Sequence, residues 1–434
     1  MRIALLCLAV ASLLPLSALA APKNIIYMIG DGMGPSYVAA YRYYQRDPAA
    51  SVVANTVYDD LLTGMASTYP DDDTLVTDSA ASATALATGI KTFNGAISVN
   101  RQHIPIGTMM QLAKRLGKAN GIVASSQVNH ATPASFLAHN SSRRNMNAIA
   151  DMYLDYRIDG KPVADLIIGG GTKYFVREDR NLIAGFTELG YQYTDDYKQL
   201  AGLTRLPAIA LLTENALPAV LNSDYDSMLA PLTEKALQLL STADKGFVLM
   251  VEGSQIDWCG HDNDIACAMA EMHDFAKAIE VAKAYVDANP DTLLIVTADH
   301  ETGGLSLGAN GVYQWHTEVI KRVKATGREI AKQLQQLENQ QDISKRYTEL
   351  TGISLDKAQL QLLTTALSNE DEKVARSQIL QFINDASLTG WTSGGHTAAD
   401  VPVMAYGKNA GEFNGFMDNT AIAKKLIQYI QQTK

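Results

Sequence analysis

The sequence predicts an α/β protein whose central sheet is covered by helices on both faces. Short, continuously apolar runs alternate along the chain with stretches that have apolar residues at helical spacing. A polar or glycine-rich turn follows each apolar run at once. Of the 434 residues, 47% are hydrophobic and 19% are charged, so the chain can bury a sizeable core and is neither a disordered chain nor a polytopic membrane protein.

The predicted strands lack the polar alternation of a sheet that has one face in water, which indicates burial on both faces. They are expected at residues 24–29, 121–125, 165–168, 246–251 and 292–297. Helices are expected at residues 106–116, 232–241 and 269–288. Ligands of such folds gather beyond the carboxyl ends of the strands, so the chemistry of the protein is expected there.

Residues 313–385 differ in character from the rest, because they are rich in Gln, Lys and Glu and contain no strand-like run. Ile330, Leu334 and Leu337 recur there at helical spacing. We interpret the segment as a helical insertion; an ordinary solvated face of the main fold is the alternative. Neither a repeat nor a proline-rich linker divides residues 21–434, which are expected to form a single domain.

The first twenty residues have the pattern of a cleaved secretory signal: Arg2, a long apolar run and small residues at its end. We expect Ala21 to begin the mature chain. Pro15 interrupts the run and no stop-transfer signal follows, so a membrane anchor is the weaker alternative. The protein is therefore expected in the periplasm or outside the cell, without a membrane anchor in its mature form.

Cys259 and Cys267 are the cysteines of the expected mature chain, in a compartment where disulfides persist. A disulfide between them is expected, and two buried thiols are the alternative. A thiolate metal site is disfavoured because the chain has no CxxC pair.

The formal net charge of −10 and the lack of any Lys/Arg stripe bear on partners. The long-range field would repel nucleic acid and anionic lipid. No nucleic-acid partner is expected, and a polyanionic ligand would need a local cationic site.

Carboxylates and imidazoles follow three of the predicted strands. Asp31 stands in GDGMG after the first strand, and Asp299 and His300 follow the strand at 292–297. Asp257 and His261 are four residues apart after the strand at 246–251, so one helical turn can aim both at a single ion. Each pattern alone is weak, since a lone His is more often structural.

Together these patterns predict a metal site, because the chain has only eight histidines. A further imidazole, His396, lies in the glycine-rich SGGHT. Mixed oxygen and nitrogen ligands without sulfur favour zinc or a similar divalent ion. Glu252 and Asp31 with a hydroxyl would suit a harder, magnesium-like ion.

Ser79 precedes a run of small residues, SAASATALATG, that predicts a helix packed tightly against a neighbour. Its hydroxyl is either the N-cap of that helix or a nucleophile. A hydroxyl at a helix N-terminus near metal ions would meet an anion where backbone N–H groups point.

From Asp31 to His396 these stretches resemble, in order, the motifs of the alkaline phosphatase family. The matching stretches are GDGMG, TDSAASATALATG, HATP from His130, VEGSQIDWCGH, TADHETGG and SGGHT. The resemblance implies a three-layer α/β/α sandwich with a mixed, mostly parallel central sheet and a helical insertion of the crown type. It also implies that the single domain is catalytic, that it holds two zinc ions and one magnesium ion, and that it forms a homodimer.

Carried over by motif, Ser79 would be the residue that is phosphorylated in a covalent intermediate. The ligands of one zinc would be Asp257, His261 and His396, and those of the other Asp31, Asp299 and His300. Asp31 would also bind the magnesium, together with Thr132 and Glu252. Arg143 stands at the position of the arginine that clamps phosphate, whose guanidinium can hold two oxygens in a fork.

Asp78, His130 and Trp258 are expected beside the ligands rather than on an ion. The best-known bacterial members carry Asp and Lys where this chain has His130 and Trp258, and the His and Trp pair resembles the cold-active marine branch. The selectivity of the third site for magnesium is therefore open. Trp258 could also only fill space, and His130 could only be a hydrogen-bond partner.

The implied activity is hydrolysis of phosphate monoesters with little discrimination among alcohols, because the contacts are concentrated on the phosphoryl group. A related phosphodiesterase or sulfatase is the alternative enzyme, and a secreted metal- or phosphate-binding protein is the alternative of another class. His316 could line the site or pack within the insertion.

Overall fold

The structure of the protein is a computed structural model that describes residues 20–432. The signal expected at residues 1–20 therefore lies, apart from Ala20, outside the described residues. Among the helices of residues 20–432, none combines the length and the apolarity that crossing a bilayer requires.

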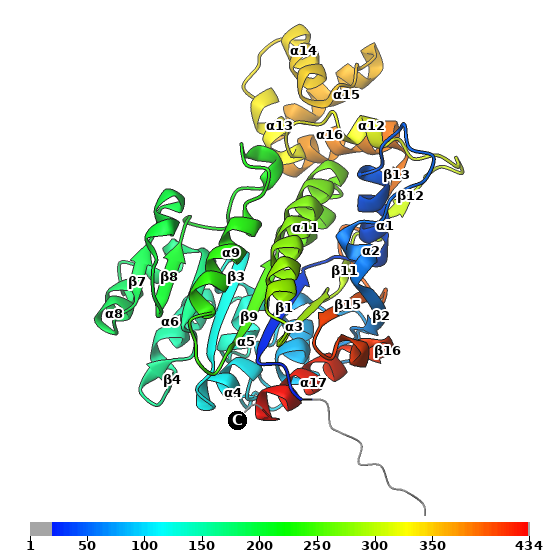
Figure 1. Cartoon of the computed structure of the whole chain (residues 1–434). Coiled ribbons are helices and arrows are strands. Elements are labelled where there is room, and N and C mark those ends of the chain that lie inside the picture. The colour runs from blue at the N-terminus through cyan, green and yellow to red at the C-terminus, as the bar shows by residue number, and fades with distance from the viewer. Residues whose placement is uncertain (1–19, 433–434) are drawn as a thin grey trace, which may run out of the picture.

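A ten-stranded mixed sheet runs through the centre of the molecule (Figure 1). In spatial order its strands are β16 (Gly415–Asp418), β2 (Leu62–Ser67), β15 (Val401–Gly407), β10 (Thr292–Thr297), β1 (Asn24–Gly30), β9 (Phe247–Gly253), β3 (Ala119–Gln127), β6 (Leu166–Gly170), β8 (Ala208–Leu211) and β7 (Gln192–Thr194). Only β15 is antiparallel to its neighbours in this sheet. The sheet is mostly parallel, as predicted.

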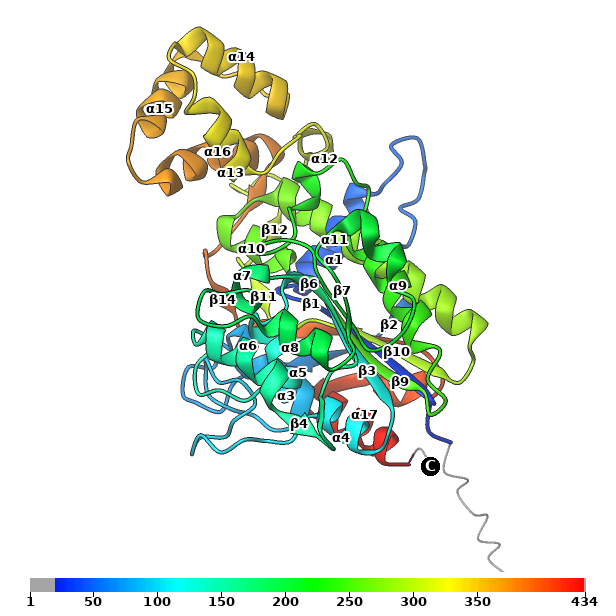
Figure 2. The ribbon, with the colours of Figure 1, turned by 90° about the vertical axis from the view of Figure 1, so that its left-hand side faces the viewer.

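Helices cover both faces of the sheet, which explains why every residue of β1, β9 and β10 is buried. In Figure 2 one layer contains α9 and α11, and the opposite layer contains α3, α5, α6 and α8. The α-helices of the first half of the chain are α1 (Pro35–Tyr44), α2 (Val57–Leu61), α3 (Ser79–Thr88), α4 (Met109–Arg115), α5 (Ala131–Leu137), α6 (Met146–Asp155), α7 (Thr172–Phe175) and α8 (Leu182–Glu188). Those of the second half are α9 (Leu229–Leu240), α10 (Gln255–Asp262), α11 (Ile265–Ala288), α12 (Thr317–Ile320), α13 (Gly327–Leu334), α14 (Gln340–Thr351), α15 (Lys357–Leu367), α16 (Glu372–Ser387) and α17 (Asn419–Gln432).

All five predicted strands and all three predicted helices are present, with ends that capping residues shift. α4 begins at Met109 because Thr108 and Gln111 form a capping box before it. α11 begins earlier than predicted, at Ile265, because the side chain of Asp264 accepts a hydrogen bond from Cys267 N. The apolar runs locate the elements, and the polar caps set their first residues.

Residues 20–432 also form three short two-stranded sheets outside the central one. They are β4 (Arg157–Ile158) with β5 (Lys161–Pro162), β11 (Glu301–Thr302) with β14 (His396–Thr397), and β12 (Ser306–Leu307) with β13 (Thr389–Gly390). The pair β11–β14 brings His396 beside the segment that follows β10. Distant parts of the sequence therefore meet at this end of the sheet.

Between β12 and β13 the described chain contains helices α12 to α16 and no strand. Figure 1 shows α13, α14, α15 and α16 together above the end of α11, away from the central sheet. Ile330 and Leu334 on α13 are buried, so these helices enclose apolar side chains of their own. The extent of the insertion as a unit stays a prediction.

Candidate active site

The carboxyl ends of three neighbouring strands deliver buried acidic groups to one place. Asp31 follows β1, Glu252 lies near the end of β9 and Asp299 follows β10. These three side chains and that of His300 are completely buried. The adjacent strands β1, β9 and β10 run parallel, which is why the sequence could predict this meeting point.

Asp31, Asp299 and His300 form the first group, with ligand atoms that all lie within 4.8 Å of one another. His300 Nε2 is 3.3 Å from Asp31 Oδ1 and 3.2 Å from Asp299 Oδ2. Gly32, at φ +76°, donates its N–H to Asp299 Oδ1 at 3.1 Å. A side chain at position 32 would collide with the backbone of Asp257, so the glycine of GDGMG allows this close approach.

Asp257, His261 and His396 form the second group. α10 places His261 one turn after Asp257, with His261 Nε2 3.3 Å from Asp257 Oδ2. His396 Nε2 lies 3.4 Å from Asp257 Oδ1 and 3.2 Å from His261 Nε2. The predicted helical turn is present.

Backbone carbonyls fix the tautomers of both imidazoles in the second group. His261 Nδ1 donates to Gly394 O and His396 Nδ1 donates to Thr77 O, each at 2.8 Å. Nδ1 is thereby protonated in both rings and both Nε2 atoms face Asp257, so a metal ion that displaces any proton from Nε2 finds its ligand atoms already oriented.

Glu252, Asp31 and His130 form a third group of possible ligands, although His130 was expected only beside the ligands. The Oγ1 atom of Thr132 is also buried here. Burial raises the pKa of Glu252 to about 7. Ser126 Oγ donates to its Oε2 at 3.3 Å, and its Oε1 is buried without a hydrogen-bond partner among the described residues.

Described protein groups, chiefly His300 beside Asp31 and Asp299, balance the charge of this cluster of acids only in part. Burial, together with Asp299, Asp257 and Glu252, raises the pKa of Asp31 well above its usual range, and neither of its oxygens accepts a hydrogen bond from a described residue. Burying several carboxylates side by side is costly unless cations balance them. Oxygen and imidazole donors in three groups, without sulfur, fit divalent metal ions.

Ser79 lies next to the first group, at the start of α3. Its Oγ is 3.2 Å from His300 Nε2, and the side chain is only 1% exposed. Asp78, not Ser79, is the N-cap, since Asp78 Oδ1 accepts from Ala81 N at 2.9 Å. The capping alternative for Ser79 is therefore wrong, and the described contact of its hydroxyl is with His300.

Asp78 also holds Arg143, a contact that the sequence did not reveal. Arg143 Nη1 lies 3.0 Å from Asp78 Oδ2, and Arg143 Nη2 donates to His130 Nε2 at 3.2 Å. One carboxylate therefore caps the helix of Ser79 and orients the guanidinium. The sequence offered one signal for this role: Asp is a preferred N-cap residue, and Asp78 directly precedes Ser79.

His130 lies between Arg143 and Trp258. Its ring packs edge-on against the Trp258 indole, with centroids 5.8 Å apart. Burial and the nearby Arg143 charge lower the pKa of His130 to about 3, so the ring is neutral. Because Arg143 can only donate, His130 Nε2 accepts and the proton of the neutral ring lies on Nδ1.

Cys259 on α10 and Cys267 on α11 form a disulfide, as predicted, with Cα atoms 5.4 Å apart. The bridge joins the helix that carries Asp257 and His261 to the long helix α11. The helix that carries His261 is thereby fixed covalently to α11, which covers one face of the sheet.

Reduction of this disulfide is expected to lower the free energy of unfolding by about 2 kcal/mol, because the bridge closes only a short loop. Thermal melts with and without reductant would measure this, with the double variant Cys259→Ser, Cys267→Ser as a control that reductant should not affect. Two alkylatable thiols in a non-reduced digest would contradict the pairing.

Three further polar residues, among them His316, lie apart from these groups. Arg144 is exposed. His316 is the N-cap residue of α12 and its Nδ1 lies 3.3 Å from Glu318 Oε1, within the helical segment. His139, which is buried, contacts Gln111 and Ser98 and has a structural role.

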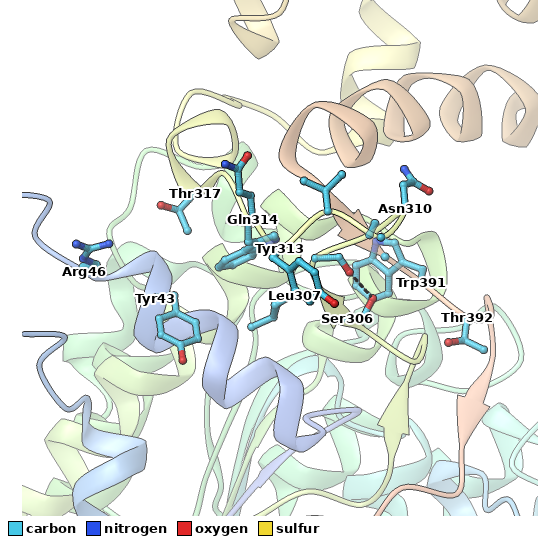
Figure 3. A pocket seen from close by; sticks show the side chains of 16 residues that line it. Tyr43, Arg46, Ser306, Leu307, Asn310, Tyr313, Gln314, Thr317, Trp391 and Thr392 are labelled. Atoms are coloured by element: carbon cyan, nitrogen blue, oxygen red, sulfur yellow. Dashed lines mark hydrogen bonds between the residues drawn. The ribbon is translucent and has the colours of Figure 1, made fainter.

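A separate cavity of about 960 Å³ opens between α1 and the β12–β13 pair. Figure 3 shows Tyr43, Tyr313 and Trp391 among its lining side chains. Its described lining contains no member of the three groups. Trp391 lines this cavity and also begins the segment that leads to His396.

Comparison with known proteins points to a single family. Residues 22–432 match the family described as alkaline phosphatase. The chain is 44% identical over 411 residues to alkaline phosphatase 3 of Bacillus subtilis, covering 94% of this chain and 89% of that protein.

Solved structures agree with this match. A cold-active alkaline phosphatase from a psychrophilic Shewanella species is 47% identical, with a TM-score of 0.89, covering 94% of this chain and 99% of that one. A mutant of the TAB5 alkaline phosphatase with magnesium bound in its M3 site is 27% identical, with a TM-score of 0.70, covering 95% and 99% of the two chains.

Proposed function

The chain belongs to the alkaline phosphatase family, and from this premise we propose that it hydrolyses a broad range of phosphate monoesters through a phosphoserine at Ser79. The observation that carries the proposal is the meeting of three possible metal-ligand groups, Ser79 Oγ and Arg143 at one end of the sheet. Members of this family depend on metal ions, and the donor groups fit such ions.

We propose zinc at the first and second groups, because each combines carboxylate and imidazole donors. The ligands would be Asp31, Asp299 and His300 at one ion, and Asp257, His261 and His396 at the other. When bound, the ions would act as Lewis acids that stabilise charge on the attacking and leaving oxygens and favour ionisation of the serine hydroxyl.

We propose magnesium at the third group, held by Asp31, Glu252 and Thr132. Hard oxygen donors suit magnesium, which keeps several of its waters. Nδ1 of His130 carries a proton while Arg143 donates to Nε2, so His130 is suited to hydrogen-bond such a water rather than to bind the ion.

The chain's own residues would carry out two displacements. Ser79 Oγ would bond to phosphorus as the bond between phosphorus and the ester oxygen breaks, and the substrate would leave as an alcohol with a proton equivalent to the one that the serine hydroxyl loses. Water would then bond to phosphorus while Ser79 Oγ leaves, which releases inorganic phosphate and restores the serine. Arg143, held by Asp78, would keep the phosphoryl oxygens in place through a two-pronged contact.

We also propose that the protein is exported and forms a homodimer. The N-terminal pattern supports secretion to the periplasm or beyond, and the family supports a homodimer. The substrates would be small phosphate monoesters, and no nucleic-acid partner is proposed because the net charge is −10.

Release of p-nitrophenol from its phosphate monoester, its phosphodiester and its sulfate, at fixed zinc and magnesium, tests the function. We expect the monoester to be hydrolysed fastest by a wide margin. Faster turnover of the diester or the sulfate would identify one of the related hydrolases. No turnover by metal-loaded protein would identify a binding protein.

Changing Trp258→Lys is expected to tighten inhibition by inorganic phosphate several-fold and to lower kcat. Trp258 adjoins Asp257 and contacts His130, so a cation there would hold the phosphate dianion, with an effect of roughly 1 kcal/mol for one partly solvated charge. Because product release often limits the rate of such reactions, tighter binding of phosphate would slow turnover.

The measurement is Ki for phosphate in the wild type, in Trp258→Lys and in Trp258→Phe, which keeps a ring without a charge. Inhibition that is unchanged or weaker in the lysine variant, at full metal content, would show that Trp258 only fills space.

A further inference from the structure

The segment from Trp391 to His396 leads from β13 to the second group. Its backbone is hydrogen-bonded to Gly303, with Thr392 N and Ser393 N donating to Gly303 O and Gly303 N donating to Gly395 O. The segment contains Gly394 and Gly395, which have no side chains that could pack and hold it in place, so its position depends on hydrogen bonds and on the neighbouring side chains. His261 Nδ1 donates to Gly394 O, which means that the position of this segment orients both imidazoles of the group. Whatever fixes the segment therefore fixes the donor geometry.

Asn384, on α16 of the helical segment, connects both sides of this arrangement. Its Nδ2 donates to Asn263 O at 3.0 Å, and its Oδ1 accepts from Trp391 Nε1 at 3.2 Å. Asn263 ends α10, two residues after His261. Asn384, which is only 8% exposed, thus links the helix that carries His261 to the segment that leads to His396.

Asn263 provides a second link between the end of α10 and the segment that leads to His396. It has a left-handed backbone at φ +57°, a conformation that asparagine tolerates better than most residues. One terminal atom of its side-chain amide lies 2.9 Å from both Gly260 O and Ser393 O, and because both carbonyls can only accept, we assign the amide nitrogen to this position. The end of α10 and the His396 segment are therefore held together by Asn263 directly and by Asn384 through Trp391.

The indole of Trp391 also makes contacts that place the segment against the first group. It packs edge-on against Tyr37, with centroids 6.2 Å apart. A Cβ on Gly303 would lie 2.6 Å from the ring, so the indole rests directly on the glycine turn after His300. The polar edge of this ring is the part that Asn384 holds.

Further bonds anchor the helical segment to the turn between α10 and α11. Asp264 Oδ2 accepts from Gly327 N at 2.7 Å, at the start of α13. Arg376 of α16 pairs with Asp262 at 3.1 Å. In Figure 2, α13 and α16 lie directly above α10. The base of this segment is thus fixed on the turn that follows His261.

We propose that Asn384 is a positioning residue that sets the geometry of the His261 and His396 donors through Asn263 and Trp391. The inference rests on the proposed zinc at this group. It assigns a role in zinc retention to the helical segment, which supplies no ligand of its own. Groups that orient metal ligands through hydrogen bonds are known to tune metal affinity.

Zinc release from the metal-loaded full-length chain into a chromogenic chelator tests this role. Asn384→Leu keeps a side chain of similar size and removes both hydrogen bonds. One of the two zinc equivalents should then be released roughly ten-fold faster than from the wild type. Gln381→Leu, one turn earlier on the exposed face of α16, is the matched control and should release zinc at the wild-type rate. At saturating zinc, kcat of Asn384→Leu should recover toward the wild-type value.

Trp391→Phe provides a second test that keeps the ring packing and removes only the Nε1 donor. It should accelerate loss of the same zinc equivalent by a smaller factor, and it serves as the deciding variant if Asn384→Leu does not fold. Unchanged zinc release in the folded variants would overturn the proposal, as would equal acceleration in Gln381→Leu. A wild type that holds no zinc would instead contradict the proposed function itself.

Discussion

Replacing Ser79 with alanine is expected to lower kcat by roughly 10²- to 10⁵-fold, because the covalent route is lost while the ligands remain in place. Ser79 is buried, its Oγ is 3.2 Å from His300 Nε2, and it does not cap its helix. The change should therefore leave the helix and the metal content intact. Steady-state kinetics with p-nitrophenyl phosphate and metal analysis of the same samples would measure both.

Thr88→Ala is a matched control for this experiment. It removes a buried hydroxyl from the other end of the same helix, where Thr88 Oγ1 donates to Thr84 O. This variant should lose stability but keep most of its turnover. Near-normal activity of Ser79→Ala at full metal content would remove Ser79 from the mechanism.

Removal of metal ions is expected to abolish turnover and to lower the melting temperature. Without metal ions Asp31, Asp299 and Glu252 lie buried near one another, and His300 balances their charge only in part. Ions that bind only the folded state stabilise it by mass action. Activity and thermal melts should be measured after exhaustive chelation and dialysis.

Adding zinc and magnesium together should restore more activity than zinc alone, because the third group offers mostly hard oxygen donors. Calcium alone should restore none, since it disfavours imidazole ligands. Full activity after complete removal of metal, or restoration by calcium alone, would contradict the proposed ligand sets.

The fold was largely predictable because its strands are local, continuous apolar runs. β1, β9 and β10 could be recognised from the sequence alone, and the rule that ligands gather beyond strand ends then placed Asp31 and Asp299 together. The order of the strands in the sheet was not predictable from periodicity. The antiparallel insertion of β15 depends on contacts between segments far apart in the chain.

The site shows the same division between local and distant contacts. Asp257 and His261 share one helical turn, so their spacing predicted their proximity. The pairing of Asp78 with Arg143 spans 65 residues and has no local pattern. Asn384 was not singled out because an asparagine on a polar helix has no distinctive signal until the fold brings it beside Trp391.

The role of Ser79 as the nucleophile is tested most directly by mass spectrometry of enzyme that is quenched in acid during turnover of a phosphate monoester. The acid preserves a phosphoserine, and digestion then locates it. We predict one phosphate per chain at most, on the peptide that contains Ser79, and none on that peptide in Ser79→Ala. Rapid turnover with no phosphate on Ser79, or with phosphate on another residue, would contradict the account.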